Sequence, residues 1–469
     1  MSEQPGATVQ KAGPAYIYLV SFVAAIGGFI WGYDIVIMSS VILFLEPFYD
    51  LSSWEKGFAM SSATIGIIVG LITCGRLADF VGRKWTMFGA AILFGISAIG
   101  TAFPIGFADW NIYRVIGGIG AGLAMMVSPM YLAEIAPANR RGFLVLFNQL
   151  AVVLGAFLSA LAGYWIAEKT GESVETAWRW MLISECIPII PFVVGLYFIP
   201  RSPRWLVEQG NLDEAREVLT KIDGAEHAER ELQDIGESLG EETGTFSELF
   251  LPGIRMALLI AIALAAFQQW TGQSSMGYYV PSIFEDAGIG SKSDAIFQMI
   301  ILRIWNTAWT VFAILTVDRL GRRPLLLWGC LGMALGLGIL GVTFQLEASP
   351  KILLLAMFIS EASYIISLAP VTWVLISEVF PTRIRARGMM VAILVLQGSA
   401  LIVNWGFPVL RDYFTDELGL KGLIFWLFSL VCLGAWVFCY FMVPETKGKT
   451  LEEIQRFWMH GKKEESKGD

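Results

Sequence analysis

The amino-acid sequence predicts an all-α membrane protein in which twelve transmembrane helices form two pseudo-symmetric six-helix bundles. Three observations predict this fold class: the composition, a series of long apolar segments, and an internal repeat of charged loops. The 469 residues are 55% hydrophobic and only 16% charged. A water-soluble chain of this length would need far more charge to cover its surface, so the composition indicates a membrane protein.

Twelve apolar segments follow one another along the chain, each near the length of about 20 residues that crosses a bilayer core. Because backbone polar groups in lipid must be satisfied within the spanning structure, each segment is expected to be a helix. The short alternating segments of a β-barrel are absent from the sequence. The predicted spans are 17–45, 57–75, 85–104, 112–133, 143–167, 180–199, 254–283, 295–316, 324–344, 352–378, 389–410 and 422–443.

The distribution of Lys and Arg predicts the orientation, because basic residues concentrate in cytoplasmic loops. Four short loops hold 11 Lys and Arg in 35 residues, whereas the six loops at the opposite ends of the segments hold 7 in 60. This asymmetry predicts a multi-pass protein of the cell membrane with both termini in the cytoplasm. The four basic loops are 76–84, 134–142, 317–323 and 379–388.

The domain organisation follows from the charged stretch 200–253, which separates the two groups of six segments. Its Leu and Ile residues recur at helical spacing, which predicts a few short amphipathic helices on the cytoplasmic face. The predicted parts are an N-terminal six-helix bundle (1–199), a cytoplasmic helical linker (200–253), a C-terminal six-helix bundle (254–443) and a cytoplasmic tail (444–469).

An internal repeat relates the two bundles. The loop Gly75–Lys84 resembles Val317–Arg323, and the loop Glu134–Gly142 resembles Glu378–Gly388. Matched positions in these loops, and in the turns that begin at residues 200 and 444, are offset by 239 to 244 residues. Parallel six-helix repeats with a site between them near the membrane midplane are typical of alternating-access carriers.

These motifs, taken together, carry a resemblance to a known family. The chain resembles the sugar porters of the major facilitator superfamily over nearly its whole length, and it is most similar to the bacterial proton-coupled xylose symporters. The segments that carry the resemblance are Gly75–Lys84, Pro129–Gly142, Pro200–Leu206, Gln268–Gln269 with Tyr278–Tyr279, Asp318–Arg323, Pro370–Gly388 and Pro444–Thr446.

The resemblance implies the major facilitator fold and a secondary active transporter that imports a sugar or polyol by alternating access with proton symport. A facilitative uniporter and a transporter-like sugar sensor remain as alternatives. No Ser/His/Asp set, metal cluster or phosphate loop is present in the sequence, so neither an enzyme nor a cofactor or metal is predicted. The expected partners are the sugar or polyol, a proton and membrane lipid; no nucleic acid is expected, and the chain is expected to be a monomer.

Asp34 and Arg114 are the candidate residues for proton coupling. A carboxylate inside a transmembrane segment is costly unless it is paired or faces water, so Asp34 is a functional candidate by default. Arg114, in the fourth segment, is a natural partner because a guanidinium binds a carboxylate through two parallel hydrogen bonds. In the family's proton symporters this aspartate pairs with this arginine; a static structural pair is the alternative.

The candidate substrate site combines amides with aromatic side chains. Amides donate and accept hydrogen bonds without net charge, as sugar hydroxyls require, and an aromatic face packs against the C–H face of a sugar ring. The alternative is that buried amides simply join helices. By resemblance, the site residues are Trp31, Gln149, Gln268, Gln269, Ser274, Tyr278, Tyr279, Asn306, Trp373 and Gln397.

Some of these positions depart from the family pattern, which leaves the substrate open among hexoses, pentoses, inositols and other polyols. Ser274 stands where the family has Asn, and Gln397 stands where it usually has Trp. Arg303, three residues before Asn306, stands where the family has Gly, and the tenth segment carries an unusual acid, Glu361. Two interpretations remain: an Arg303–Glu361 pair that braces two helices, or contact of Arg303 with an acidic substrate such as a sugar acid.

A last set of charges lies in the repeated cytoplasmic loops. The family resemblance implies that they form salt bridges at helix ends, which hold the outward-open state and break on inward opening. Charges on solvated loops are the alternative. This predicted cytoplasmic gate comprises Asp79, Arg83, Glu134 and Arg140 in the first half and Asp318, Arg322, Glu378 and Arg385 in the second.

Overall fold

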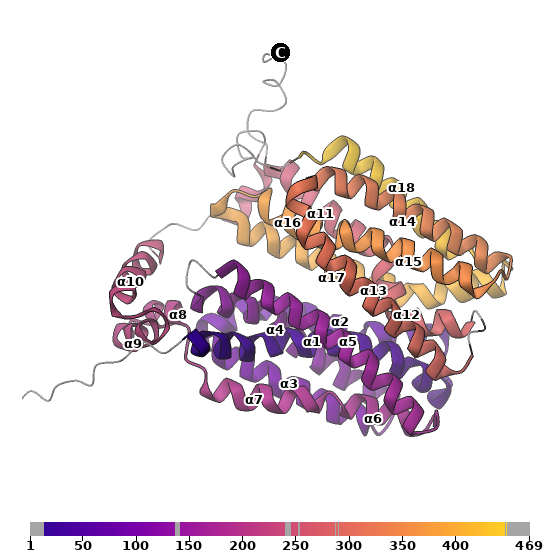
Figure 1. Cartoon of the computed structure of the whole chain (residues 1–469), viewed down its shortest axis with the longest axis horizontal. Helices are drawn as coiled ribbons and strands as arrows, with labels where there is room; N and C mark the ends of the chain where they lie inside the picture. The colour runs from indigo at the N-terminus through magenta and orange to yellow at the C-terminus, as the bar shows by residue number, and fades with distance from the viewer. Residues whose placement is uncertain are drawn as a thin grey trace, which may run out of the picture. The chain divides into compact units, whose positions relative to one another are not determined.

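The computed structural model of the chain describes residues 14–136, 141–239, 245–251, 254–286, 288, 290–445 and 447, and these residues are almost entirely helical (Figure 1). The elements, in chain order, are α1 (Pro14–Tyr49), α2 (Ser53–Val81), α3 (Arg83–Ala102), α4 (Phe107–Ile135), α5 (Arg141–Lys169), α6 (Ala177–Ile183), α7 (Cys186–Phe198), α8 (Pro203–Glu208), α9 (Leu212–Asp223), α10 (Ala225–Leu239), the 3-10 turn η1 (Phe246–Phe250), α11 (Ile254–Trp270), α12 (Gln273–Asp286), α13 (Lys292–Leu320), α14 (Arg322–Gln345), α15 (Pro350–Ile366), α16 (Leu368–Glu378), the 3-10 turn η2 (Thr382–Ile384), α17 (Arg385–Asp416) and α18 (Leu423–Met442).

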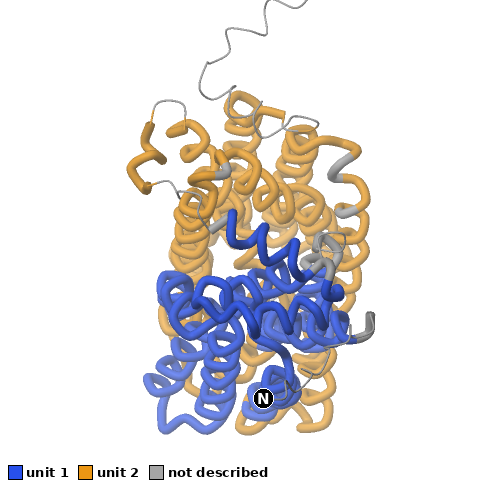
Figure 2. The backbone as a smooth tube through the Cα atoms, turned by 90° about the vertical axis from the view of Figure 1, so that its left-hand side faces the viewer, with its two compact units in different colours: residues 1–37, 65–159, 179–241 blue, residues 38–64, 160–178, 242–469 orange. Residues whose placement is uncertain are grey.

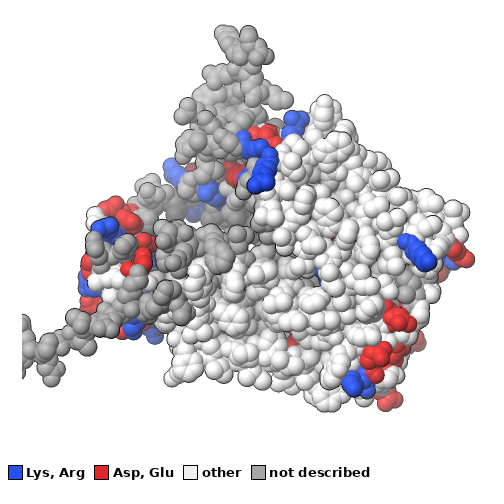
Figure 3. Space-filling view, viewed as in Figure 1, with Lys and Arg blue, Asp and Glu red and all other residues white. Residues whose placement is uncertain are grey.

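Twelve helical stretches of the described chain are long and apolar enough to cross a membrane, which confirms the predicted all-α membrane fold. Their bounds fall within a few residues of the segments expected from hydropathy. On the face shown in Figure 3, charged side chains gather toward the ends of the spanning helices and leave a broad uncharged surface between them. Such a surface suits contact with the hydrocarbon core of a bilayer, where an exposed charge is costly.

Three of the twelve spans are interrupted rather than continuous. The span Ala177–Phe198 divides into α6 and α7, Ile254–Glu285 into α11 and α12, and Pro350–Glu378 into α15 and α16. Discontinuous helices in transporters place free backbone groups and polar side chains at the binding sites. These three breaks are therefore the expected positions of a binding site.

The break between α11 and α12 depends on Gly272. Its φ is +78°, a left-handed conformation that residues with a Cβ rarely adopt, and a Cβ there would lie 2.3 Å from the ring of Phe428. Gln268, one turn before the break, donates from Nε2 to the carbonyl oxygens of Leu368 and Ala369 at 3.2 and 3.1 Å. The break in the seventh span is thereby joined to the break in the tenth.

The described chain divides into two compact units, which comprise 1–37, 65–159 and 179–241 in unit 1 and 38–64, 160–178 and 242–469 in unit 2 (Figure 2). The division runs through α1, α2, α5 and α6, so it does not coincide with the linker. Unit 2 holds the C-terminal helices together with the ends of α1 and α2 that face the α1–α2 loop. That loop region is anchored inside unit 2 by a hydrogen bond between Ser53 and Asp412 and by the Trp54 and Trp405 rings, whose centroids are 4.8 Å apart.

Three short helices, α8, α9 and α10, form the stretch that follows the sixth span, and Figure 1 shows them together beyond the helix ends of unit 1. The indole of Trp205 in α8 donates to the carbonyl oxygen of Asp79 at 2.9 Å. Arg83 reaches Glu208 at the end of α8 at 3.4 Å. These contacts attach the amphipathic helices to the loop between α2 and α3.

The internal repeat is visible in the backbone as well as in the sequence. Gly82 precedes α3 with φ +88°, and Gly321 precedes α14 with φ +90°. Each is followed by an arginine that bonds to a glutamate of the same bundle, Arg83 to Glu134 and Arg322 to Glu378, both at 3.0 Å. The two halves therefore use the same turn and the same ion pair.

Candidate transport site

The first part of the site is a buried ion pair between α1 and α4. Arg114 donates from both terminal nitrogens to Asp34, at 2.5 Å to Oδ1 and 3.2 Å to Oδ2. Asp34 is 8% exposed and Arg114 is 4% exposed. The structure thus brings together the two residues that the sequence analysis paired, in the fork-to-fork geometry that guanidinium and carboxylate favour.

A second carboxylate, Glu185, joins this pair. It lies at the break between α6 and α7, is 2% exposed, and lies close enough to Asp34 and Arg114 to interact electrostatically with both. Glu185 was not among the site residues expected from the sequence, although an acid within the apolar stretch 180–199 is a functional candidate for the same reason as Asp34. Only the packing of the helices shows that the two acids share one arginine.

Neutral hydrogen bonds hold the backbone on both sides of this triad of Asp34, Arg114 and Glu185. Tyr33 and Ser184, the residues that precede the two acids, are linked through their hydroxyls at 2.7 Å. The hydroxyl of Ser159 in α5 donates to the carbonyl oxygen of Tyr33 at 2.8 Å. These contacts fix α1 against α5 and against the break between α6 and α7, and so position the two carboxylates.

The second part of the site is a group of amide side chains in unit 2, on α11 and α13. Gln268 and Gln269 are 4% and 6% exposed, and Asn306 is half-buried. Their side-chain oxygens have no hydrogen-bond partner in the described part of the chain. Buried polar atoms are normally satisfied, so these three free acceptors are suited to bind the hydroxyl groups of a ligand.

Two tyrosines of α12 and one tryptophan of α16 also belong to the predicted set in unit 2. Tyr279 is fully buried, donates to the carbonyl oxygen of Asn404 at 3.3 Å, and stacks on Phe407 with ring centroids 5.1 Å apart. Trp373 and Tyr278 are half-buried. The structure therefore makes Tyr279 a packing residue of α12, whereas Trp373 and Tyr278 keep part of their rings accessible.

The remaining predicted residues are placed less distinctively. Gln397 is buried in α17 and Ser274 is half-buried in α12. In unit 1, the indole nitrogen of Trp31 in α1 has no hydrogen-bond partner among the described residues, and Gln149 lies exposed on α5. Neither Trp31 nor Gln149 belongs to the unit that holds the other eight predicted substrate residues.

The predicted direct pair between Arg303 and Glu361 is not among the contacts within 4 Å in the described chain. Arg303 instead donates to the carbonyl oxygen of Gly277 at 3.1 Å, and Asn306 donates from Nδ2 to Glu361 at 3.4 Å. The two charges still attract each other across the space between α13 and α15. The sequence spacing correctly put Arg303 and Asn306 on one side of α13, but the helix rotation sets Asn306, not Arg303, against the acid.

Five of the eight predicted cytoplasmic gate charges contact one another, three in the first half and two in the second. Arg83 contacts Asp79 at 3.3 Å in addition to Glu134, and Arg322 pairs with Glu378. The Nε of Arg385 donates to the carbonyl oxygen of Phe380 at 3.4 Å. Arg140 lies outside the described residues, and so does the side chain of Asp318 in α13.

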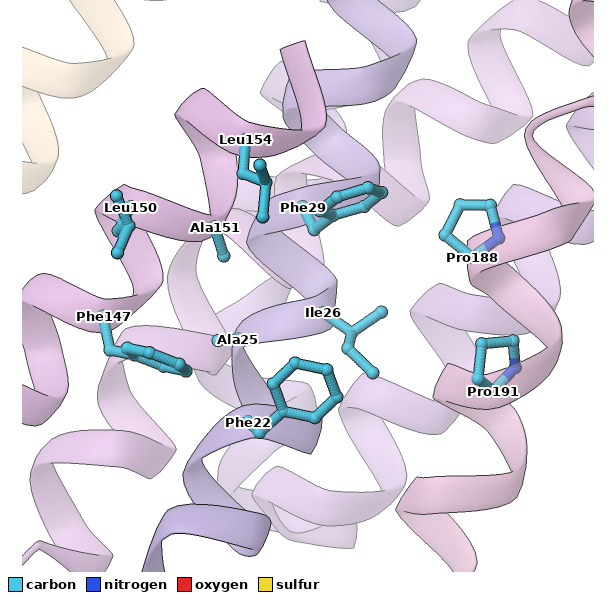
Figure 4. A pocket seen from close by; sticks show the side chains of 10 residues that line it. All are labelled: Phe22, Ala25, Ile26, Phe29, Phe147, Leu150, Ala151, Leu154, Pro188 and Pro191. Atoms are coloured by element: carbon cyan, nitrogen blue, oxygen red, sulfur yellow. The ribbon is translucent and has the colours of Figure 1, made fainter. Parts of the chain in front are cut away.

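An apolar pocket of about 290 Å³ opens in unit 1 between α1, α5 and α7 (Figure 4). A sugar there would lose its hydrogen bonds to water without gaining others, so this pocket does not fit a polyol. Its lining, which is entirely apolar and includes strongly exposed rings and alkyl groups, suits lipid tails. The lining residues are Phe22, Ala25, Ile26, Phe29, Phe147, Leu150, Ala151, Leu154, Pro188 and Pro191.

These features define a secondary membrane transporter rather than an enzyme. They are the twelve spanning helices, the interrupted spans with buried polar side chains at their breaks, and the buried charge cluster. Comparison with known proteins agrees with this class. The family described as "Sugar (and other) transporter" matches residues 20–458. The chain belongs to this family of the major facilitator superfamily.

Individual relatives extend over the whole chain. The D-xylose-proton symporter of Escherichia coli strain K12 is 38% identical over an aligned length of 474, covering 95% of this chain and 96% of that protein. The arabinose-proton symporter of Bacillus subtilis strain 168 is 36% identical, with 95% of each chain covered. Among solved structures, the inward open conformation of the xylose transporter XylE from E. coli has a TM-score of 0.83 at 36% identity, covering 94% of this chain and 100% of that chain.

Proposed function

We propose that this chain imports a neutral sugar or a similar polyol across the cell membrane in symport with protons. The observation that carries the proposal is the buried triad of Asp34, Arg114 and Glu185. The names of the relatives, which are proton symporters of xylose and arabinose, support the same substrate class and coupling ion.

The charge balance of the triad explains how it would hold a proton. Two ionised carboxylates and one guanidinium carry a net charge of about −1, which is costly in an interior shielded from water. One shared proton makes the triad neutral, and it would let one of the two carboxyl groups donate to the other, because an ionised carboxylate can only accept. A further proton on Asp34 would break its ion pair with Arg114 and free α1 from α4.

The orientation proposed from the basic loops gives the other contacts a place in the transport cycle. It puts both termini and α8–α10 in the cytoplasm and the α1–α2 loop outside. The contacts of Ser53 with Asp412 and of Trp54 with Trp405 in unit 2 then lie on the outer side of the membrane. The ion pairs of Arg83 and Arg322 then lie at the inner ends of the helices, where they would hold each bundle together.

The energy available from the proton is sufficient for accumulation of a neutral solute. One charge that moves down 100 mV releases about 2.3 kcal/mol. At about 1.4 kcal/mol per tenfold concentration ratio, this supports roughly a 50-fold gradient. Each chain carries both halves of the carrier, so we expect a monomer to suffice.

The test is uptake of radiolabelled D-xylose, L-arabinose, D-glucose and myo-inositol into proteoliposomes with an imposed pH gradient. The wild type should accumulate at least one of these above equilibrium, and a protonophore should abolish the accumulation. Asp34→Asn keeps the shape but loses the titratable charge. This variant should still exchange substrate when both sides are loaded, and it should lose uphill uptake.

A matched variant separates coupling from binding. Gln269→Ala removes one amide of the predicted substrate site and should weaken binding by about 1–3 kcal/mol, while uphill uptake persists at high substrate concentration. Wild-type uptake that never exceeds equilibrium would instead indicate a uniporter. Continued accumulation by Asp34→Asn would show that another acid carries the proton.

A further inference from the structure

A group of polar side chains in unit 2 combines two opposite charges with two unsatisfied atoms. Arg303 and Asn306 lie one turn apart on α13, and Glu361 lies on the neighbouring α15 and is 4% exposed. Both charged residues stand inside spanning segments, where an ionisable side chain indicates function. Both also stand out in the sequence, because by resemblance the family has Gly where this chain has Arg303, and the acid Glu361 is unusual in the tenth segment.

The contacts within this group leave two buried polar atoms without a hydrogen-bond partner among the described residues. Arg303 is bonded through one terminal nitrogen to Gly277 O at 3.1 Å, while its Nε has no partner in the described chain. Asn306 gives its amide hydrogen to Glu361 at 3.4 Å, while its Oδ1 is also free. The free oxygens of Gln268 and Gln269 lie in the same unit. A pair that served only to brace the helices would use these donors and acceptors on each other.

We propose that Arg303 and Glu361 line the substrate site as a charge-balanced pair and restrict this transporter to polyhydroxylated substrates without net charge. The proposal rests on the function proposed above and names the two residues that exclude charged ligands from that site. A hydroxyl group both donates and accepts, so one hydroxyl can accept from the guanidinium and another can donate to the carboxylate. Asn306, already bonded to Glu361, aligns the carboxylate for this contact.

The balance of charges explains why a sugar acid is excluded. A carboxylate that bound Arg303 would also approach Glu361, and like charges in a medium of low polarity repel strongly. An amino sugar would approach Arg303 in the same way when it bound Glu361. Neutral polyols meet neither penalty, so specificity arises from repulsion of the wrong ligands as well as attraction of the right one.

The charge-balance proposal predicts an exchange of charge preference in single variants. Binding of D-glucose, myo-inositol, D-glucuronate and D-glucosamine to purified protein is measured by thermal stabilisation and by competition against the radiolabelled neutral substrate. The wild type should prefer its neutral ligand at least tenfold over both charged compounds. Glu361→Gln should improve D-glucuronate relative to the neutral ligand by about tenfold, and Arg303→Gln should do the same for protonated D-glucosamine.

The double variant Arg303→Gln with Glu361→Gln is the matched control, because it removes both charges and keeps the net charge at zero. It should gain neither charged ligand, and it remains informative if a single variant does not fold. Unchanged ratios of charged to neutral ligand in the single variants, or a wild type that prefers D-glucuronate, would overturn the inference. The proposed function fails separately, if the wild type transports no sugar or polyol at all.

Discussion

Removal of both buried acids of the triad, Asp34 and Glu185, should destabilise the protein far more than removal of either one. In Asp34→Asn, the remaining carboxylate of Glu185 can ionise and balance the charge of Arg114. In Glu185→Gln, the bidentate pair of Asp34 and Arg114 is left intact. In the double variant, Arg114, which is only 4% exposed in the wild type, loses both carboxylates of the triad.

The magnitude follows from the geometry of the pair. The Arg114 nitrogens lie 2.5 and 3.2 Å from the two oxygens of Asp34, so the charge centres are within about 4 Å and attract by about 4 kcal/mol at an effective dielectric constant of 20. Loss of one partner of a buried pair typically costs about 3–5 kcal/mol. We expect about 1.5 kcal/mol or less for each single variant and about 4–5 kcal/mol for the double variant.

The assay is a double-mutant cycle on unfolding of the detergent-purified protein, with Tyr33→Phe as a neutral control. That control removes the hydroxyl contact with Ser184 and should cost about 1 kcal/mol. A coupling of at least 1 kcal/mol between Asp34 and Glu185 is expected. Costs that add to within about 0.5 kcal/mol would show that the two acids act independently, and the shared-proton reasoning would then be wrong.

Two further predictions concern the turns and the α5–α6 loop. Gly82→Ala should lower the free energy of unfolding by about 1–2 kcal/mol, because the backbone φ of Gly82 is +88°. The control is Gly89→Ala in α3, which should not destabilise the protein because a Cβ at this position meets no other atom within 4 Å. Equal unfolding curves for the two variants would contradict this prediction. Burial alone would raise the pKa of Glu172, but hydrogen bonds from the Ser293 hydroxyl and amide lower it below the ordinary value. The contribution of ionised Glu172 to the free energy of unfolding should therefore be present at neutral pH and disappear as the pH falls through that lowered pKa. The measurement is the difference in melting temperature between wild type and Glu172→Gln as a function of pH. A difference that persists at low pH would exclude this contact as the cause.

Much of this protein could be predicted from its sequence because the relevant signals are local. Hydrocarbon demands about 20 consecutive apolar residues and a helical backbone, so the length of each segment predicts a span without knowledge of its neighbours. The repeated loops predict two related halves for a similar reason, because the residues that form each turn are neighbours in the sequence. Gly82 and Gly321 stand at matching positions of the two loops, and each has the positive φ that its turn requires. The partnership of Asp34 with Arg114 followed from the high cost of an isolated charge in lipid, together with the family resemblance.

The tertiary structure was needed wherever the answer depended on how one helix is rotated against another. Glu185 stands beside Asp34 because the break between α6 and α7 faces α1, and neither residue's sequence neighbours indicate this. The same is true of Glu361, which contacts Asn306 rather than Arg303, although both lie on one side of α13. Successive residues of a helix point about 100° apart, so a small rotation of α13 about its axis would bring a different side chain to face Glu361. The hydropathy of the segment is the same for every rotation, so only the packing of side chains between helices selects the partner.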